Sequence, residues 1–67
     1  PAAIFESVHR LSKKGGSEAV ARCPTQADAE QASDWLLDRL SRLAPSVKFV
    51  TEITSGGGQY LLKLRTN

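Results

Sequence analysis

Apolar and polar residues alternate with a period of two in four segments of the chain, which is the pattern of a strand with one buried face. The first segment runs from Ala2 to Ser12, and the second runs from Ser17 to Cys23. The third runs from Val47 to Thr54, and the fourth runs from Gln59 to Arg65. We therefore predict four β-strands.

Two short breaks that contain glycine lie between these segments. Lys13 to Gly16 separates the first segment from the second, and Ser55 to Gly58 separates the third from the fourth. Glycine adopts the positive φ angles that tight turns between antiparallel strands require. We interpret both breaks as hairpin turns.

The middle of the chain has the spacing of a helix instead. Pro24 ends the second strand, Thr25 and Asp28 form a capping pair, and Pro45 ends the segment. Between them, apolar residues recur at steps of three and four positions, which predicts one apolar stripe along a helix. The residues of this stripe are Ala29, Ala32, Leu36, Leu40 and Leu43.

These elements predict a single α+β domain over residues 1–67, with one helix packed on one face of a four-stranded ββαββ sheet. The first and fourth strands carry the bulkier apolar residues, so we place them in the centre and obtain the order 2-1-4-3. A fully antiparallel order, 2-1-3-4, is the alternative. The hairpin-helix-hairpin order resembles the topology of β-grasp domains and of small immunoglobulin-binding bacterial domains. The resemblance lies in topology and length, and no motif extends it to a function.

Composition excludes several ways of stabilising so short a chain. A domain of this length buries only about 60% of its unfolded surface, so its stability is thin. One cysteine and one histidine exclude an intrachain disulfide and a Cys/His zinc site within the chain. We expect no cofactor and no metal, and oligomerisation remains as a source of stability.

The chain contains no apolar run of the roughly 20 residues that a membrane helix needs, so we expect no membrane contact. A single unpaired cysteine favours a reducing compartment, and we predict a cytoplasmic protein. Cys23 is interpreted as a small buried thiol, and Trp35 as a plug at the edge of the core. Because no set of acid, base or metal ligands converges, we expect no enzyme activity.

The sheet face away from the predicted helix combines apolar and basic side chains. An exposed face of this kind is typical of a contact surface, so we predict a regulatory or inhibitory protein-binding module that acts through this face or an edge strand. Its partner would be another protein or a second copy of the chain. The predicted partner-binding residues are Ile4, Val8, Arg10, Arg22, Lys48, Val50, Leu61, Lys63 and Arg65.

Nucleic-acid binding on the same face is the alternative function. Five of the nine basic residues of the chain lie there. Sheet surfaces that bind single strands, however, present exposed aromatic rings on which bases stack. Phe5, Phe49 and Tyr60 are predicted on the inward face, and the net charge is only +2. These observations favour protein binding.

Overall fold

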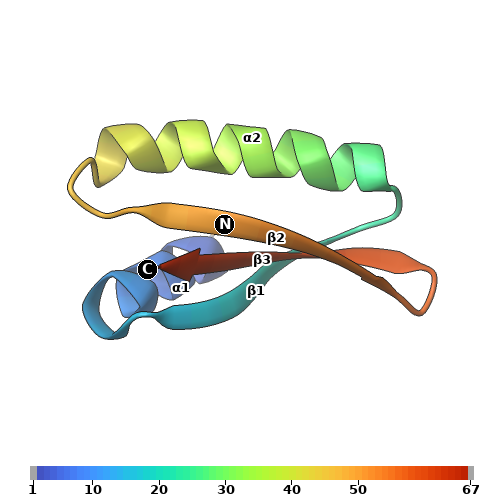
Figure 1. Ribbon diagram of the computed structural model, residues 1–67, viewed down its shortest axis with the longest axis horizontal. Coiled ribbons are helices and arrows are strands. Elements are labelled where there is room, and N and C mark those ends of the chain that lie inside the picture. Colours follow the sequence, from blue (N-terminus) through green and yellow to red (C-terminus); the bar gives the residue numbers. More distant parts are fainter. Residues whose placement is uncertain (1, 67) are drawn as a thin grey trace.

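The computed structural model describes residues 2–66, and within this range the chain forms two helices and three strands (Figure 1). Their order along the chain is α1 (Ala2–Lys14), β1 (Gly16–Cys23), α2 (Gln26–Leu43), β2 (Phe49–Gly56) and β3 (Gln59–Thr66). The three strands form an antiparallel sheet in the order β1-β3-β2. The α+β class is therefore confirmed, but the four-stranded sheet with a single helix is wrong.

The first predicted strand is helix α1. Its apolar residues Ile4, Val8 and Leu11 follow the spacing of a helix, with the small Ser7 between them on the same side. Ser7 and Leu11 are buried, and Ile4 and Val8 pack against the core. A period of two would have placed His9 inside, whereas the helix leaves it exposed. The segment folds as a helix because that arrangement buries its aliphatic residues together.

The first glycine break ends this helix and makes no hairpin. Gly15 has a φ angle of 72°, and its N–H donates a hydrogen bond to the carbonyl of Leu11 at 2.9 Å. This is the left-handed cap that glycine commonly provides after the last turn of a helix. Lys13 and Lys14 lie in that last turn, where positive charge favours the helix dipole. The second break, at Gly57 and Gly58, is a hairpin turn as predicted.

The loss of the first predicted strand changes the sheet order. The last strand, β3, is central and pairs with both β1 and β2. Both predicted orders, 2-1-4-3 and 2-1-3-4, are wrong because they required a strand at Ala2 to Ser12. The β-grasp-like topology is excluded for the same reason.

The predicted helix is confirmed as α2. Thr25 is its N-cap, and its side-chain oxygen accepts a hydrogen bond from the N–H of Asp28 at 3.1 Å. The hydroxyls of Ser33 on α2 and Thr51 on β2 lie 2.6 Å apart, which ties the helix to the sheet. A hydroxyl pair within this contact satisfies both polar groups where water is largely excluded.

The core lies where both helices meet the central strand. Leu11 of α1, Leu36 and Leu40 of α2, and Leu64 of β3 form one buried cluster. Leu11 of α1 and Leu40 of α2 both belong to the cluster around Leu64, whose side chain lies on one face of the sheet. Helices α1 and α2 therefore cover this same face, and the other face is open.

A β-bulge between Ala19 and Ala21 adjusts the edge strand β1 to this arrangement. The extra residue, Val20, packs against the core, while Glu18 and Cys23 pair with Leu64 and Tyr60 on the helix-covered side. Cys23 is buried, as predicted for a small thiol. Because of the bulge, residues of β1 before and after Val20 both face the helices.

Candidate functional site

A narrow apolar groove with room for about 20 Å³ lies between the two helices. We call it the interhelical groove. The residues that line it are Ile4, Phe5 and Val8 of α1, and Trp35, Leu36, Arg39, Leu40 and Leu43 of α2. All but one of these are apolar, and they come from two elements that are distant in sequence.

The groove gathers the exposed large hydrophobic side chains of the described residues. Phe5 is 52% exposed, Trp35 is 55% exposed and Leu43 is 63% exposed. Leu36 and Leu40 lie beneath them and belong to the core. Because scattered apolar residues are normal on a protein surface whereas clustered ones mark contact sites, this clustering makes the groove a candidate binding site.

Helical periodicity explains how the sequence builds the two walls. Trp35, Arg39 and Leu43 are four residues apart, so they lie along one flank of α2. Phe5 follows Ile4 and precedes Val8 by three positions, which places it on the flank of α1 beside the core stripe. Each apolar stripe is therefore wider than the part that the core covers, and the excess lines the groove.

Arg39 is the one charged residue among those that line the groove. Its guanidinium carbon lies 5.5 Å from the centroid of the Trp35 ring. An arginine at this distance over an aromatic face makes a favourable cation–π interaction of about 0.5–1 kcal/mol at an exposed site. This contact orders the tryptophan ring and places a positive charge at the edge of an apolar surface.

An ion pair attaches α1 to the edge of the sheet. The guanidinium of Arg10 donates to both carboxylate oxygens of Glu18, at 2.6 Å and 3.0 Å, and also donates to the Ser7 hydroxyl at 3.3 Å. The hydrogen bond from Arg10 lowers the pKa of the Glu18 carboxyl below its ordinary value, and Glu18 in turn raises the pKa of Arg10. The contact helps fix the position of the α1 wall relative to β1.

Three of the predicted partner-binding residues do not lie on the open sheet face. Ile4, Val8 and Arg10 belong to α1. Ile4 and Val8 are half-buried against the core and line the groove, and Arg10 binds Glu18. Their placement on a sheet surface is wrong because the segment is helical.

The other predicted residues stay near one another around the open face. In the sheet, Arg22 is opposite Leu61, Val50 is opposite Arg65, and Lys63 follows the same alternation on β3. Lys48 is exposed immediately before β2 begins. Arg65 forms an ion pair with Glu52 at 3.2 Å, so acidic groups neutralise part of the positive charge of this face.

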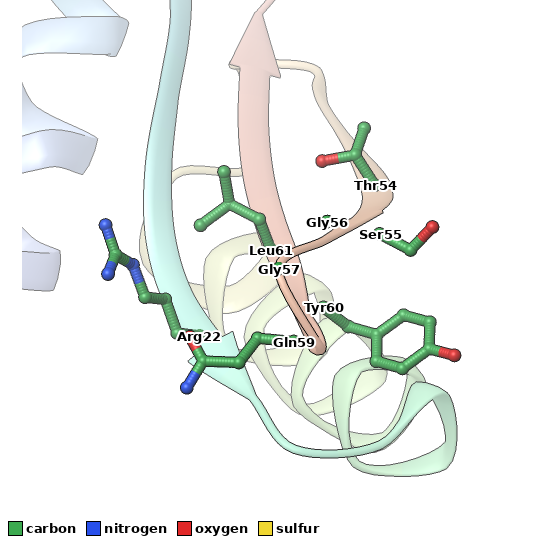
Figure 2. A pocket seen from close by; sticks show the side chains of 8 residues that line it. All are labelled: Arg22, Thr54, Ser55, Gly56, Gly57, Gln59, Tyr60 and Leu61. Carbon is green, nitrogen blue, oxygen red and sulfur yellow. The ribbon is translucent and has the colours of Figure 1, made fainter.

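A second depression, of about 430 Å³, lies at the hairpin end of the sheet (Figure 2). Arg22, Leu61 and Tyr60 line it together with hairpin residues, and the side chains of Arg22 and Tyr60 extend in opposite directions in the view. Its remaining lining is mostly small or polar: Thr54, Ser55, Gly56, Gly57 and Gln59. It contains no paired acid and base, and its lining is more polar than that of the interhelical groove.

The sequence interpretation missed the groove because it treated Trp35 as a plug of the core. The side chain is more than half exposed, so that prediction is wrong. Phe5, Arg39 and Leu43 were missed as site residues as well. The helical spacing of Ile4, Phe5, Val8 and Leu11 was the signal that could have revealed the first wall.

Within residues 2–66, no group of three or more histidine, cysteine, aspartate or glutamate side chains could hold a metal ion. None of the helices in this range has the length and apolar character needed to span a membrane. No family model, no curated protein and no solved structure matches the chain.

Proposed function

We propose that the chain is a non-enzymatic protein-binding module and that it binds its partner in the interhelical groove. The observation that carries this proposal is that Phe5, Trp35 and Leu43, the exposed large hydrophobics of the described chain, line the same groove. Burying apolar surface contributes about 25 cal/mol per Å², so covering these three side chains is the largest gain this surface offers.

The exposed side chains and the charge around the groove define the partner. Phe5 on α1 and Trp35 and Leu43 on α2 form an apolar surface. Such a surface suits a third helix laid across it whose apolar side chains recur at steps of three and four positions. Arg39 adds a positive charge at the rim of the groove, beside Trp35. The complementary ligand is therefore an amphipathic helix with an acidic side chain next to its apolar stripe.

The open sheet face supports binding less well. Val50 and Leu61 are both half-buried there, and Lys63, Arg65 and Glu52 surround them with charge. For nucleic acid, the face lacks a stacking platform among the described residues, because Phe49 and Tyr60 follow the alternation of the helix-covered side. Protein binding in the groove is consequently the function that the observations favour.

Selection from a displayed library of amphipathic helical peptides tests the proposal. We expect selected peptides to share an apolar stripe with an adjacent acid and to shift the emission of Trp35, the single tryptophan, to shorter wavelength. Anisotropy of a labelled peptide should show a loss of affinity of about tenfold or more for Trp35→Ala and for Leu43→Ala.

The double variant Val50→Ser/Leu61→Ser is the matched control, because it removes apolar side chains from the open sheet face and should leave peptide affinity unchanged. Peptides that bind Trp35→Ala as tightly as the natural protein would contradict the proposal. So would tight binding of a labelled single-stranded oligonucleotide that Lys63→Glu abolishes.

A further inference from the structure

We infer that α2 of a second copy of this chain packs antiparallel on the exposed side of α2, along the edge of the groove, about a two-fold axis that passes near Trp35. This inference rests on the proposed function and names its partner. It follows from the arrangement of charge along the exposed side of α2.

Three residues on the exposed side of α2 are spaced by seven positions. Asp28, Trp35 and Arg42 follow one another at steps of about two helical turns, so their side chains lie in one row. All three are exposed. The row begins with an acid, has the aromatic anchor in its middle and ends with a base.

Charge along the whole helix is divided in the same way. The acids Asp28, Glu30 and Asp34 precede Trp35, and the bases Arg39 and Arg42 follow it. Asp38, the acid in the second half, lies 3.6 Å from Arg42 in an exposed ion pair. The surface of α2 is therefore acidic towards its beginning and basic towards its end.

A two-fold axis at Trp35 places the acidic half of one α2 against the basic half of the other. Residues 28 and 42 are equally far from residue 35 in opposite directions, so antiparallel α2 helices place Asp28 of one copy opposite Arg42 of the other. The symmetry repeats the pair, which gives two ion pairs on either side of the two tryptophans. A parallel arrangement would instead place Asp28 opposite Asp28 and Arg42 opposite Arg42.

The available surface fits a weak dimer. A standard interface buries about 800 Å² on each partner, which is roughly a sixth of the 4564 Å² surface of this chain. Helix α2 alone is about 27 Å long at 1.5 Å for each of its 18 residues, and the groove with Phe5 and Leu43 runs beside it. We expect a dissociation constant in the micromolar range, about 1–100 µM.

Sedimentation equilibrium of the full chain between about 1 and 500 µM tests the dimer. We expect a monomer–dimer equilibrium that Trp35→Ala weakens by about tenfold or more, with Val50→Ser as a control that leaves it unchanged. Circular dichroism of each variant confirms that the helices remain folded.

Charge reversal tests the register. Asp28→Arg alone and Arg42→Asp alone each place like charges opposite one another twice in a homodimer, so each should dissociate about tenfold more readily. An equimolar mixture of the two variants restores opposite charges in both pairs and should form a heterodimer of natural affinity. The mixture contains the same folded chains as the separate samples, so damage to one helix cannot produce the rescue.

Failure of the rescue, or dimerisation that Trp35→Ala leaves intact, overturns this inference. A strict monomer that still binds the selected peptides through Trp35 also overturns it and leaves the proposed function standing. A strict monomer that binds no peptide overturns both.

Discussion

Leu40 and Leu43 are the same residue type on the same helix, three positions apart, yet one is 2% exposed and the other is 63% exposed. Leu40 lies over the central strand and packs with Leu11 and Leu64, whereas Leu43 lies on the flank of α2 that lines the groove. The core and the interhelical groove are thus two parts of one apolar stripe. Only the part that faces the sheet stabilises the fold of a single chain.

The width of the layers explains why the stripe is divided. Three strands are about 4.8 Å apart, so the outer two are separated by only about 10 Å, and so narrow a sheet does not cover the full apolar stripes of two helices. Helices α1 and α2 both meet the sheet at Leu64 of the central strand, and the interhelical groove remains between them. Phe5, Trp35 and Leu43 line this groove and remain exposed.

The largest expected effect is on the free energy of unfolding, and it distinguishes the core from the interhelical groove. Leu40→Ala removes a buried side chain and should lower the free energy of unfolding by about 2–5 kcal/mol. Leu43→Ala removes an exposed one and should change it by no more than about 0.5 kcal/mol at concentrations where the chain is monomeric. Urea denaturation followed by circular dichroism measures both values, and similar losses for the two variants would remove the distinction between core and groove.

Gly15→Ala tests the cap of α1, the helix that contributes Leu11 to the core and Phe5 to the groove. The backbone at Gly15 has a φ angle of 72°, and the nearest atom to an added Cβ would be Thr66 Oγ1 at an ordinary 3.5 Å, so the cost comes from the backbone. We expect a loss of about 1 kcal/mol in the free energy of unfolding.

Gly56→Ala is the matched control for this variant. Its φ angle is not in the left-handed region and nothing lies within 4 Å of an added Cβ, so its effect should be close to zero. Equal effects of the two variants in thermal unfolding would contradict the helix cap at Gly15.

The smallest effect concerns the attachment of α1 to β1. Because Arg10 lowers the pKa of Glu18, folding favours the charged carboxylate. The ion pair therefore stabilises the fold above the ordinary glutamate pKa, and this contribution is lost as the pH falls through the lowered pKa of the folded state. Glu18→Gln should reduce the acid sensitivity of the free energy of unfolding between about pH 6 and pH 3.

Glu52→Gln is the comparison for Glu18→Gln, because Glu52 also pairs with an arginine but on the open sheet face. Both ion pairs are exposed, so each effect is small. A Glu18→Gln profile that follows the natural protein at every pH would show that the pair does not hold α1.

Local signals predicted α2 and the last hairpin correctly. The cap at Thr25, the apolar stripe that includes Leu36 and Leu40, and the glycines at 57 and 58 act within a few residues of their own position. Strand β1 was recognised from its alternation, although its bulge was not. These elements depend on residues that are close to one another in the sequence, so their signals can be recognised in the sequence directly.

The segment from Ala2 to Ser12 was not determined in this way, because its apolar residues fit both a period of two and a helix. The outer edge of β1 was open to a strand, but the helix instead places Leu11 in the core with Leu40 and Leu64. The choice between strand and helix therefore depended on long-range packing.

The pattern of residues was enough to predict the α+β class, the helix α2 and the hairpin of β2 and β3, and one cysteine excludes a disulfide within the chain. The helical state of α1 and the position of Phe5 beside Trp35 and Leu43 depend on how the elements pack in the folded chain. The physical reason is that periodicity specifies which residues share a side of an element, whereas burial depends on which element comes to cover that side. The same helix therefore contains leucines that stabilise the fold, Leu36 and Leu40, and a leucine that stays exposed, Leu43.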